Sequence, residues 1–228
     1  LRENRRTTAS PVRRRLRAGL IVAEVCMATA LAVAAGLLLR SFVAVLGVDP
    51  GFQTEHLLTL QMNVPPSAQP PAARLPFYDQ LEARLRAIPG VTHVGGTTRL
   101  PLGSTSVSTQ VDVEGRDTPP AQRPEVELRR AVFDFVGAMG ISRLRGRGFT
   151  PDDGPNTPTA GIVNTALVAK VFPNEDPIGR RIRIGPPNPS APFITIVGVV
   201  GSVKHGSLEE TPKPELYLYY RQAAEKQP

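Results

Sequence analysis

The chain has 228 residues, 41% hydrophobic and 5% aromatic with no Trp, so it is long enough for one domain with an aliphatic core plus an appendage, or for two small domains. Its formal net charge is +7, but residues 1–17 hold seven Arg against Glu3 alone, which leaves 20 basic and 19 acidic residues elsewhere. That balance excludes a broad basic face for nucleic acid, and the lone Cys26 excludes an internal disulfide framework and a Cys/His zinc site.

An apolar run follows the basic segment. Residues 18–39 contain Glu24 as their only charge, and as a helix they span about 33 Å, enough for a hydrocarbon core of about 30 Å. The apolar character continues past Arg40 to Leu46, and the long Arg40 side chain can reach the far interface. Residues 18–46 are therefore predicted to form a transmembrane helix.

The charge asymmetry around this helix predicts its orientation. The positive-inside rule places residues 1–17 in the cytoplasm and the chain after Val48 outside. A cleaved signal peptide would have a shorter apolar core, and a buried helix of a soluble protein would show a polar face. We expect Glu24 to face a neighbouring helix or the headgroups, since a proton relay would need a partner that the sequence does not show.

The residues that follow the apolar run are predicted to form a β-α-β unit. Residues 49–52 are typical of a turn, and 56–64 alternate apolar and polar residues as a strand does. A helix is predicted with Pro76 in its first turn, ended by 89–90, before a second strand over 91–98. The apolar positions are Leu58, Leu60, Met62 and Val64 in the first strand and Phe77, Leu81, Leu85 and Ile88 in the helix.

The remainder is predicted to be rich in strands. The predicted strands are Val107–Val113, Val126–Val132, Gly161–Val163, Ile182–Ile184, Ile194–Val203 and Leu216–Tyr220. Short helices are predicted over Phe133–Met139 and Thr165–Phe172, with Asn164 as the cap of the second. The fold class is therefore α+β, with two subdomains meeting near residues 100–130.

No pattern indicates catalysis, a cofactor or a metal. The histidines, His56, His93 and His205, lie far apart with no metal partner at ligand spacing, and structural or surface roles are expected. Asp152 and Asp153 form an acidic turn that is more often solvated than cation-binding. The serines Ser104, Ser106 and Ser108 lack a nucleophile-elbow context. The stretch Arg145-Gly146-Arg147-Gly148-Phe149 lacks the Lys-Ser/Thr of a P-loop.

Several linked segments resemble the periplasmic core domain of MacB-like ABC transporter permeases, and more narrowly the duplicated orphan permeases of the FtsX/MacB superfamily. The segments are Gly36–Phe42, Val48–Phe52, Ile88–Val91, Gly140–Ile141, Leu144–Phe149, Ile162–Asn164, Phe172–Pro173, Asp176–Ile182, Ile196–Gly201 and Pro214–Tyr217. Each segment is weak alone, whereas their order and spacing are specific. The resemblance runs from about Arg13 to Tyr220.

The resemblance implies a porter-like α/β domain with a second small α/β subdomain, carried outside the cytoplasm by the first transmembrane helix. The implied organisation is a basic cytoplasmic segment over 1–17, a transmembrane helix over 18–46 and a C-terminally incomplete core domain over 49–228. The implied location is the inner membrane, with the N-terminus in the cytoplasm and the main domain in the periplasm.

In such permeases the outer domain is not catalytic. The implied partners are a cytoplasmic ABC ATPase, other transmembrane helices of the same permease or a second copy, and a periplasmic protein. We therefore expect a permease component that couples membrane-helix motion to substrate or partner proteins. The alternative is a single-pass anchored module that binds a protein without transport, and a convergent polar pocket would instead favour an anchored enzyme.

Overall fold

The structure is a computed structural model that describes residues 11–65, 70–102, 107–185 and 191–223. The chain divides into two compact units, Leu1–Val48 and Asp49–Pro228.

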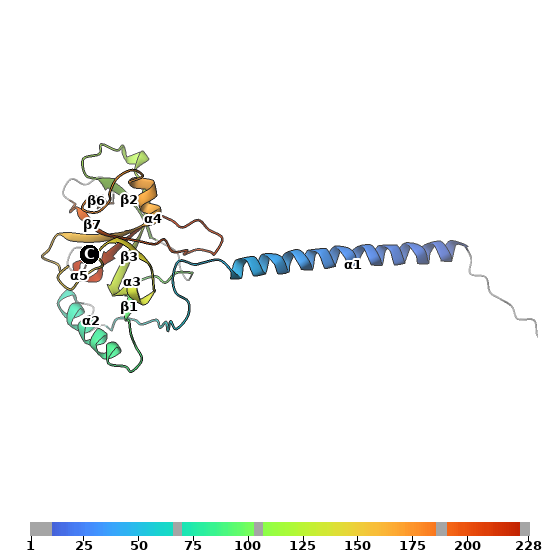
Figure 1. The fold of residues 1–228 in the computed structure, drawn as a ribbon, viewed down its shortest axis with the longest axis horizontal. Helices are drawn as coiled ribbons and strands as arrows, with labels where there is room; N and C mark the ends of the chain where they lie inside the picture. Colours follow the sequence, from blue (N-terminus) through green and yellow to red (C-terminus); the bar gives the residue numbers. More distant parts are fainter. Residues whose placement is uncertain (1–10, 66–69, 103–106, 186–190, 224–228) are drawn as a thin grey trace, which may run out of the picture. The chain divides into compact units, whose positions relative to one another are not determined.

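The first unit is a single long helix, α1 (Pro11–Leu46), drawn in blue in Figure 1. Within Val12–Leu46 an 18-residue window has a mean hydropathy of 2.2, and the helix is long and apolar enough to cross a membrane. The helix begins seven residues before the predicted span, so its first turns carry basic side chains, and the first ten residues of the predicted basic segment lie outside the described residues. Its apolar side chains are exposed in the isolated chain, as expected for a helix surrounded by lipid or by other helices.

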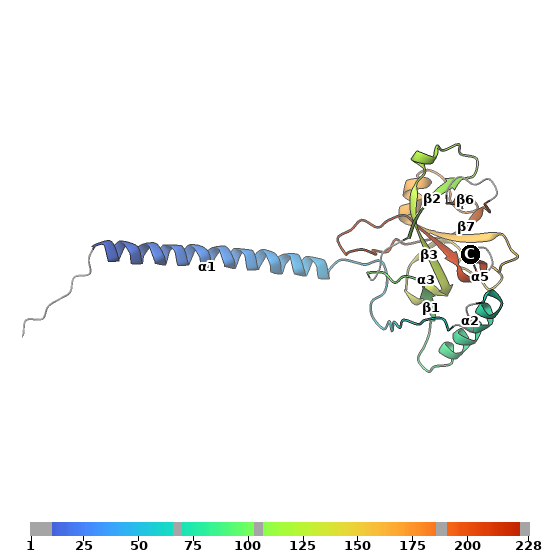
Figure 2. The ribbon, with the colours of Figure 1, turned by 180° about the vertical axis from the view of Figure 1, so that it is seen from behind.

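The second unit mixes short helices with strands, which confirms the α+β prediction. Its helices are α2 (Pro71–Arg86), α3 (Phe135–Ala138), α4 (Thr165–Val171), α5 (Tyr220–Ala223) and the 3-10 turn η2 (Pro120–Gln122). Its strands are β1 (Gly95–Thr97), β2 (Val107–Val113), β3 (Glu125–Phe133), β4 (Arg143–Gly146), β5 (Thr159–Asn164), β6 (Arg181–Ile184), β7 (Ile194–Val200) and β8 (Glu215–Tyr219). Figure 2 shows α2 beside the β1 end of this unit, with β2 and β6 at the opposite end.

Six of the strands form a closed sheet. The pairing runs from β3 through β2, β6, β7, β5 and β8 and returns to β3. The β3–β8 and β5–β7 pairs are parallel, and the other pairs are antiparallel. Closure satisfies the backbone groups that a sheet edge would expose. The strands β1 and β4 extend the sheet from β3 and β7, so the eight described strands belong to one sheet.

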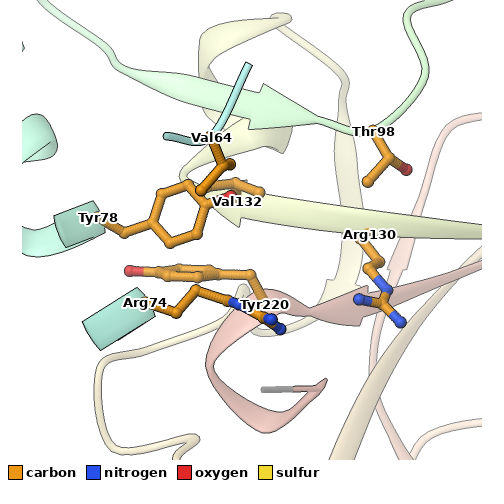
Figure 3. Close-up of a pocket in the computed structure, with 7 residues that line it drawn as sticks. All are labelled: Val64, Arg74, Tyr78, Thr98, Arg130, Val132 and Tyr220. Atoms are coloured by element: carbon orange, nitrogen blue, oxygen red, sulfur yellow. The ribbon is translucent and has the colours of Figure 1, made fainter. Parts of the chain in front are cut away.

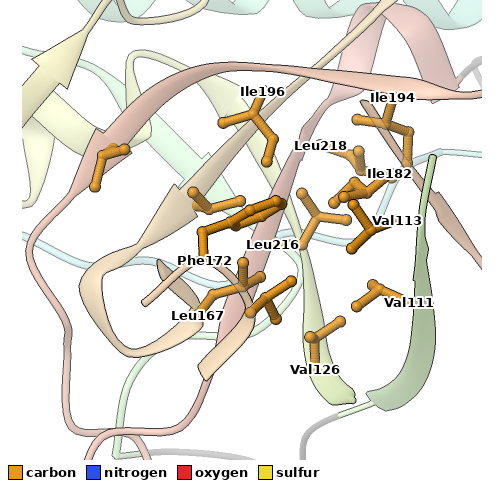
Figure 4. Close-up of a cluster of buried hydrophobic side chains, with 13 residues drawn as sticks. Val111, Val113, Val126, Leu167, Phe172, Ile182, Ile194, Ile196, Leu216 and Leu218 are labelled. Carbon is orange, nitrogen blue, oxygen red and sulfur yellow. The ribbon is translucent and has the colours of Figure 1, made fainter. Parts of the chain in front are cut away.

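The closed strands surround an aliphatic core. Figure 4 shows side chains from β2, β3, β6, β7 and β8 meeting Leu167 and Phe172 at α4. Alternation along β8 sends Leu216 and Leu218 into this core and Tyr217 into a second cluster, with Phe135 and Met139. Asn164 caps α4 as predicted, because its side chain accepts a hydrogen bond from the backbone N–H of Leu167.

The prediction of a strand over 56–64 is wrong. The sequence predicts a strand there, but in the structure His56 lies in a turn and the residues after it belong to no helix or sheet. The Leu58 side chain is 89% exposed and that of Leu60 is 66% exposed. Alternating hydrophobicity gives a strand its two faces, but a strand also needs a neighbour for its backbone groups, and the described residues supply none.

Other elements differ from prediction at their ends. The helix α2 begins at Pro71, so Pro76 lies inside it and not in its first turn. The strand expected over 91–98 is reduced to Gly95–Thr97, and β4 was not predicted because Arg143–Gly146 lacks an apolar alternation.

Candidate functional site

The residues that follow the helix segment are bonded closely to the rest of the second unit. The carbonyl of Pro50 accepts a hydrogen bond from the Lys204 N–H at 3.0 Å, and the Gln53 N–H donates to the Met139 carbonyl at 2.8 Å. Between them, Phe52 packs against the cluster that contains Met139 and Val203. We call Asp49–Gln53 the junction segment.

Glycine is required at one place in the junction segment. Gly51 has φ +84°, and a Cβ built there would lie 2.2 Å from the carbonyl oxygen of Ser202. The Asp49 side chain stabilises this turn, because its Oδ1 accepts a hydrogen bond from the Gly51 N–H at 2.8 Å. A side chain at position 51 would therefore force the junction segment away from residue 202.

The partner of the junction segment is the loop 201–205, which leaves the end of β7. The Gly201 N–H donates to the Ser142 carbonyl at 2.8 Å. The Ser202 hydroxyl accepts from the Ala166 N–H at 3.0 Å and lies 2.7 Å from the Thr165 hydroxyl, both at the start of α4. The loop is thus fixed to two elements of the domain.

A buried ionic cluster lies next to this loop. Parallel pairing of β3 and β8 sets Glu127 opposite Glu215 and Arg129 opposite Tyr217. The Arg129 guanidinium donates to Glu215 at 2.5 Å and to Glu127 at 2.7 Å, so one cation bridges two carboxylates that would otherwise repel each other. His205 from the loop completes the cluster, with Nε2 2.5 Å from Glu215 Oε1.

The second oxygen of Glu215 is also bonded. It accepts from the Tyr217 hydroxyl at 2.9 Å and from the Asn164 side-chain amide at 3.3 Å. Burial raises the pKa of Tyr217 well above its usual value, and the Glu215 charge adds to that effect, so the phenol stays a donor. Asn164 Oδ1 also accepts from the Glu215 N–H at 3.0 Å, which joins the cluster to the cap of α4.

The chemistry of this cluster is structural. The carboxylate of Glu215 is fully buried and its oxygens are occupied by donors, so it is not available as a base for a substrate. Within the described ranges, no group of three or more His, Cys, Asp or Glu could hold a metal ion. What the arrangement can do is hold β3, β8, α4 and the loop 201–205 in one register.

Sequence reasoning missed this cluster, and His205 above all. Nothing in the local sequence pairs His205 with Glu215; one signal was available in β3, where Glu127 and Arg129 place opposite charges on the same face of a strand. The other two histidines are exposed, and His93 lies 3.4 Å from Asp134.

The acidic turn at Asp152 and Asp153 contributes an ion pair within the domain. Arg147 donates to both oxygens of Asp153, at 2.6 and 2.8 Å, and the Thr150 N–H donates to the same carboxylate. Burial acts to raise the pKa of Asp153, but these hydrogen bonds outweigh it and the pKa lies below its usual value. Arg145 pairs with Asp176 at 3.0 Å. Arg145 and Arg147 of this Arg/Gly stretch therefore both bond to acidic residues of the domain itself.

The remaining predicted candidates are not brought together. Ser108 is exposed on β2, whereas Ser104 and Ser106 lie outside the described residues. Glu24 and Arg40 are both exposed along α1 in the isolated chain.

Comparison with known proteins gives one matching family model and several similar solved structures. The model of the MacB-like periplasmic core domain matches residues 25–227. The extracellular domain of the noncanonic ABC-type transporter YknZ from Gram-positive bacteria is 16% identical, with a TM-score of 0.39 over 60% of this chain and 59% of that one. The periplasmic region of MacB from Actinobacillus actinomycetemcomitans is 18% identical, with a TM-score of 0.41 over 64% of this chain and 57% of that one. The chain thus spans less than two thirds of either structure, and no curated protein matches it.

Proposed function

The chain belongs to the family of MacB-like periplasmic core domains, found in ABC-type transporter permeases, and on that premise we propose that its domain transmits movement of a membrane helix to proteins outside the cytoplasm. The observation that carries this proposal is the bonded junction segment.

The covalent connection is short. The helix α1 ends at Leu46, and three residues separate it from Pro50, whose carbonyl is bonded to Lys204. The four steps from the Cα of Leu46 to that of Pro50 reach at most about 14 Å when fully extended. A larger displacement at the end of the helix must therefore act on Pro50 and on the loop 201–205.

The domain is built to respond to such a displacement as one body. The loop continues β7, holds the start of α4 through Ser202, and reaches the buried cluster through His205. Breaking a buried ion pair costs about 3–5 kcal/mol, so the cluster resists local distortion. The domain then moves with the junction segment and does not shear within its sheet.

The same proposal implies where each part of the chain lies and which proteins it contacts. The basic first turns of α1 face the cytoplasm, and Asp49–Pro228 lies in the periplasm. The energy comes from a cytoplasmic ABC ATPase, and the exposed apolar surface of α1 contacts further transmembrane helices of the permease or a second copy. The domain itself performs no catalysis.

One observation favours a second function. The exposed apolar residues Leu58, Leu60 and Met62 lie close together along a segment that belongs to no sheet, and such a surface suits a protein partner. A single-pass anchored module that binds a protein, without transport, would use that surface and no ATPase.

An insertion tests the coupling. Four residues, Gly-Ser-Gly-Ser, are inserted after Val48 in the full chain, which is purified in nanodiscs with its associated membrane proteins. The matched control has the same insertion between Thr118 and the exposed Pro119. Hydrogen exchange of residues 201–205 is measured with and without ATP and vanadate. We expect the nucleotide to change this exchange in the wild type and the control but not in the Val48 insertion.

Two outcomes would count against coupling. A nucleotide response that survives the Val48 insertion would show that movement does not pass through the junction segment. Absence of any associated ATPase, together with a stable partner lost on Leu58→Ser, would support the anchored binding module.

A further inference from the structure

The imidazole of His205 is buried at the end of the loop 201–205, next to Lys204, which bonds to the junction segment. The His205 side chain is 7% exposed, and both of its ring nitrogens are shielded from water. Nε2 lies 2.5 Å from Glu215 Oε1, but neither ring nitrogen makes a hydrogen bond among the described residues. The attraction between this ring and Glu215 therefore depends on charge and not on an aligned hydrogen bond.

The buried charges around the imidazole are unbalanced. Glu215 from β8 and Glu127 from β3 are buried carboxylates, and Arg129 is the buried cation that bonds to both. The Lys213 ammonium lies 3.4 Å from Glu127, but the Lys213 side chain is 57% exposed, so water weakens its effect on the buried groups. Two buried carboxylates thus face one buried cation, and protonation of His205 supplies the second positive charge.

The other neighbours of the imidazole are neutral or bond elsewhere. Tyr217 stays a neutral donor, because burial raises the pKa of its phenol well above the usual value. The Lys204 ammonium donates to the Leu208 carbonyl at 2.6 Å. The Leu102 N–H donates to the backbone carbonyl of His205 at 2.9 Å, a contact that fixes the backbone and carries no charge. These contacts leave the imbalance of the buried charges as it is.

We propose that His205 is a pH-dependent latch that attaches the loop 201–205, and with it the junction segment, to the sheet. When both ring nitrogens carry a proton, the imidazolium is attracted to Glu215 and balances the second carboxylate. When the ring is neutral, it is a buried polar group without a hydrogen bond, and the attachment weakens. Arg129 still bridges Glu127 and Glu215, so the sheet stays intact while the loop loosens.

The sign of the pH dependence follows from which state binds the proton. Imidazole exchanges its second proton between about pH 5 and 8. The attached loop places the ring beside Glu215, whereas a loosened loop does not, so the latch is closed on the acidic side of this range and opens as the pH rises. This inference rests on the proposed coupling, because a loosened loop would absorb movement of the junction segment instead of passing it to the sheet.

Two measurements on the full chain in nanodiscs, without nucleotide, test the latch across about pH 5 to 8. Histidine ring NMR follows the proton on His205, with the exposed His56 and His93 as references. Hydrogen exchange of the Lys204 amide, corrected at each pH for the intrinsic chemical rate, follows the loop. We expect the protection of Lys204 to fall about tenfold as the pH rises, with the same midpoint as the His205 ring, while that of Leu218 stays constant.

A variant removes the proton-binding group. His205→Gln should show the low protection of Lys204 at every pH, whereas His93→Gln, at an exposed position, should keep the wild-type profile. Protection of Lys204 that does not change with pH in the wild type, or that changes with a midpoint different from that of the His205 ring, would overturn the latch. If His205→Gln fails to fold, the agreement of the two midpoints in the wild type decides.

Failure of the latch and failure of the coupling give different results. The response of residues 201–205 to ATP and vanadate at about pH 6, where the latch is closed, reports the coupling. An intact nucleotide response with a flat pH profile removes the latch alone. An absent nucleotide response with coincident midpoints removes the coupling and retains the latch.

Discussion

Two stretches of this domain alternate apolar residues in a similar way, but only one of them forms a strand. The strand β7 pairs with β5 on one side and with β6 and β4 on the other, and Ile194, Ile196 and Val199 are buried in the core. The segment 56–64 has the same kind of pattern, yet it belongs to no sheet, and Leu58 and Leu60 are exposed. The comparison teaches that alternation specifies two faces, whereas pairing depends on what the rest of the chain places alongside.

The largest expected loss of stability comes from a substitution within the paired strands. Glu215→Ala should destabilise the domain by about 3–5 kcal/mol, because it leaves Arg129 buried with half of its ionic partners removed. Urea unfolding of the full chain in micelles, followed by near-ultraviolet circular dichroism of the tyrosines, measures the change. Glu209→Ala, at an exposed position on the preceding loop, is the control and should change the free energy of unfolding by less than about 0.5 kcal/mol.

A leucine in each stretch tests the comparison itself. Leu216→Ala removes a fully buried side chain from the core and should cost about 2–5 kcal/mol, whereas Leu60→Ala should change stability by less than about 0.5 kcal/mol. The same unfolding measurement applies to both variants. Equal losses would mean that the segment 56–64 is packed in solution.

Replacement of a junction glycine should have an intermediate effect. Gly51→Ala combines a positive φ with a clash against Ser202 and should cost about 2 kcal/mol or more. Gly115→Ala is matched to it, since Gly115 has φ +78° with no atom near its Cβ position, and should cost about 1 kcal/mol. If the two losses are equal, the contact with Ser202 does not constrain the junction segment.

The smallest effect is a pH dependence at the acidic turn. The folded-state pKa of Asp153 lies below its unfolded value, so its contribution is fully present above about pH 4 and is lost as the pH falls through the folded-state pKa. Asp153→Asn should flatten the loss of stability below about pH 4, whereas Asp152→Asn, at its exposed neighbour, should leave that slope unchanged.

What could be predicted from the sequence depended on local signals. The bounds of β2 and the Asn164 cap of α4 follow from alternation and from a short side chain before a helix, and both are confirmed. The exposure of Leu58 and Leu60 could not be predicted, because it depends on the absence of a neighbouring strand among the described residues.

The candidate sites needed long-range information. The Glu215 cluster depends on the parallel pairing of β3 with β8, which joins residues 86 positions apart in the case of Arg129 and Glu215. A pocket lined by α2, β3 and α5 likewise joins Tyr78, Val132 and Tyr220 from three separate elements (Figure 3). Alternation and capping carry no information about such pairings.

The central claim is that the junction segment is firmly attached to the domain, and hydrogen exchange tests it most directly. In the full chain in nanodiscs, the amides of Gln53 and Lys204 should exchange as slowly as core amides such as Leu218, since their hydrogen bonds open only when the domain unfolds. If these two amides instead exchange as fast as those of residues 58–63, the junction segment frays locally and cannot transmit movement from the helix.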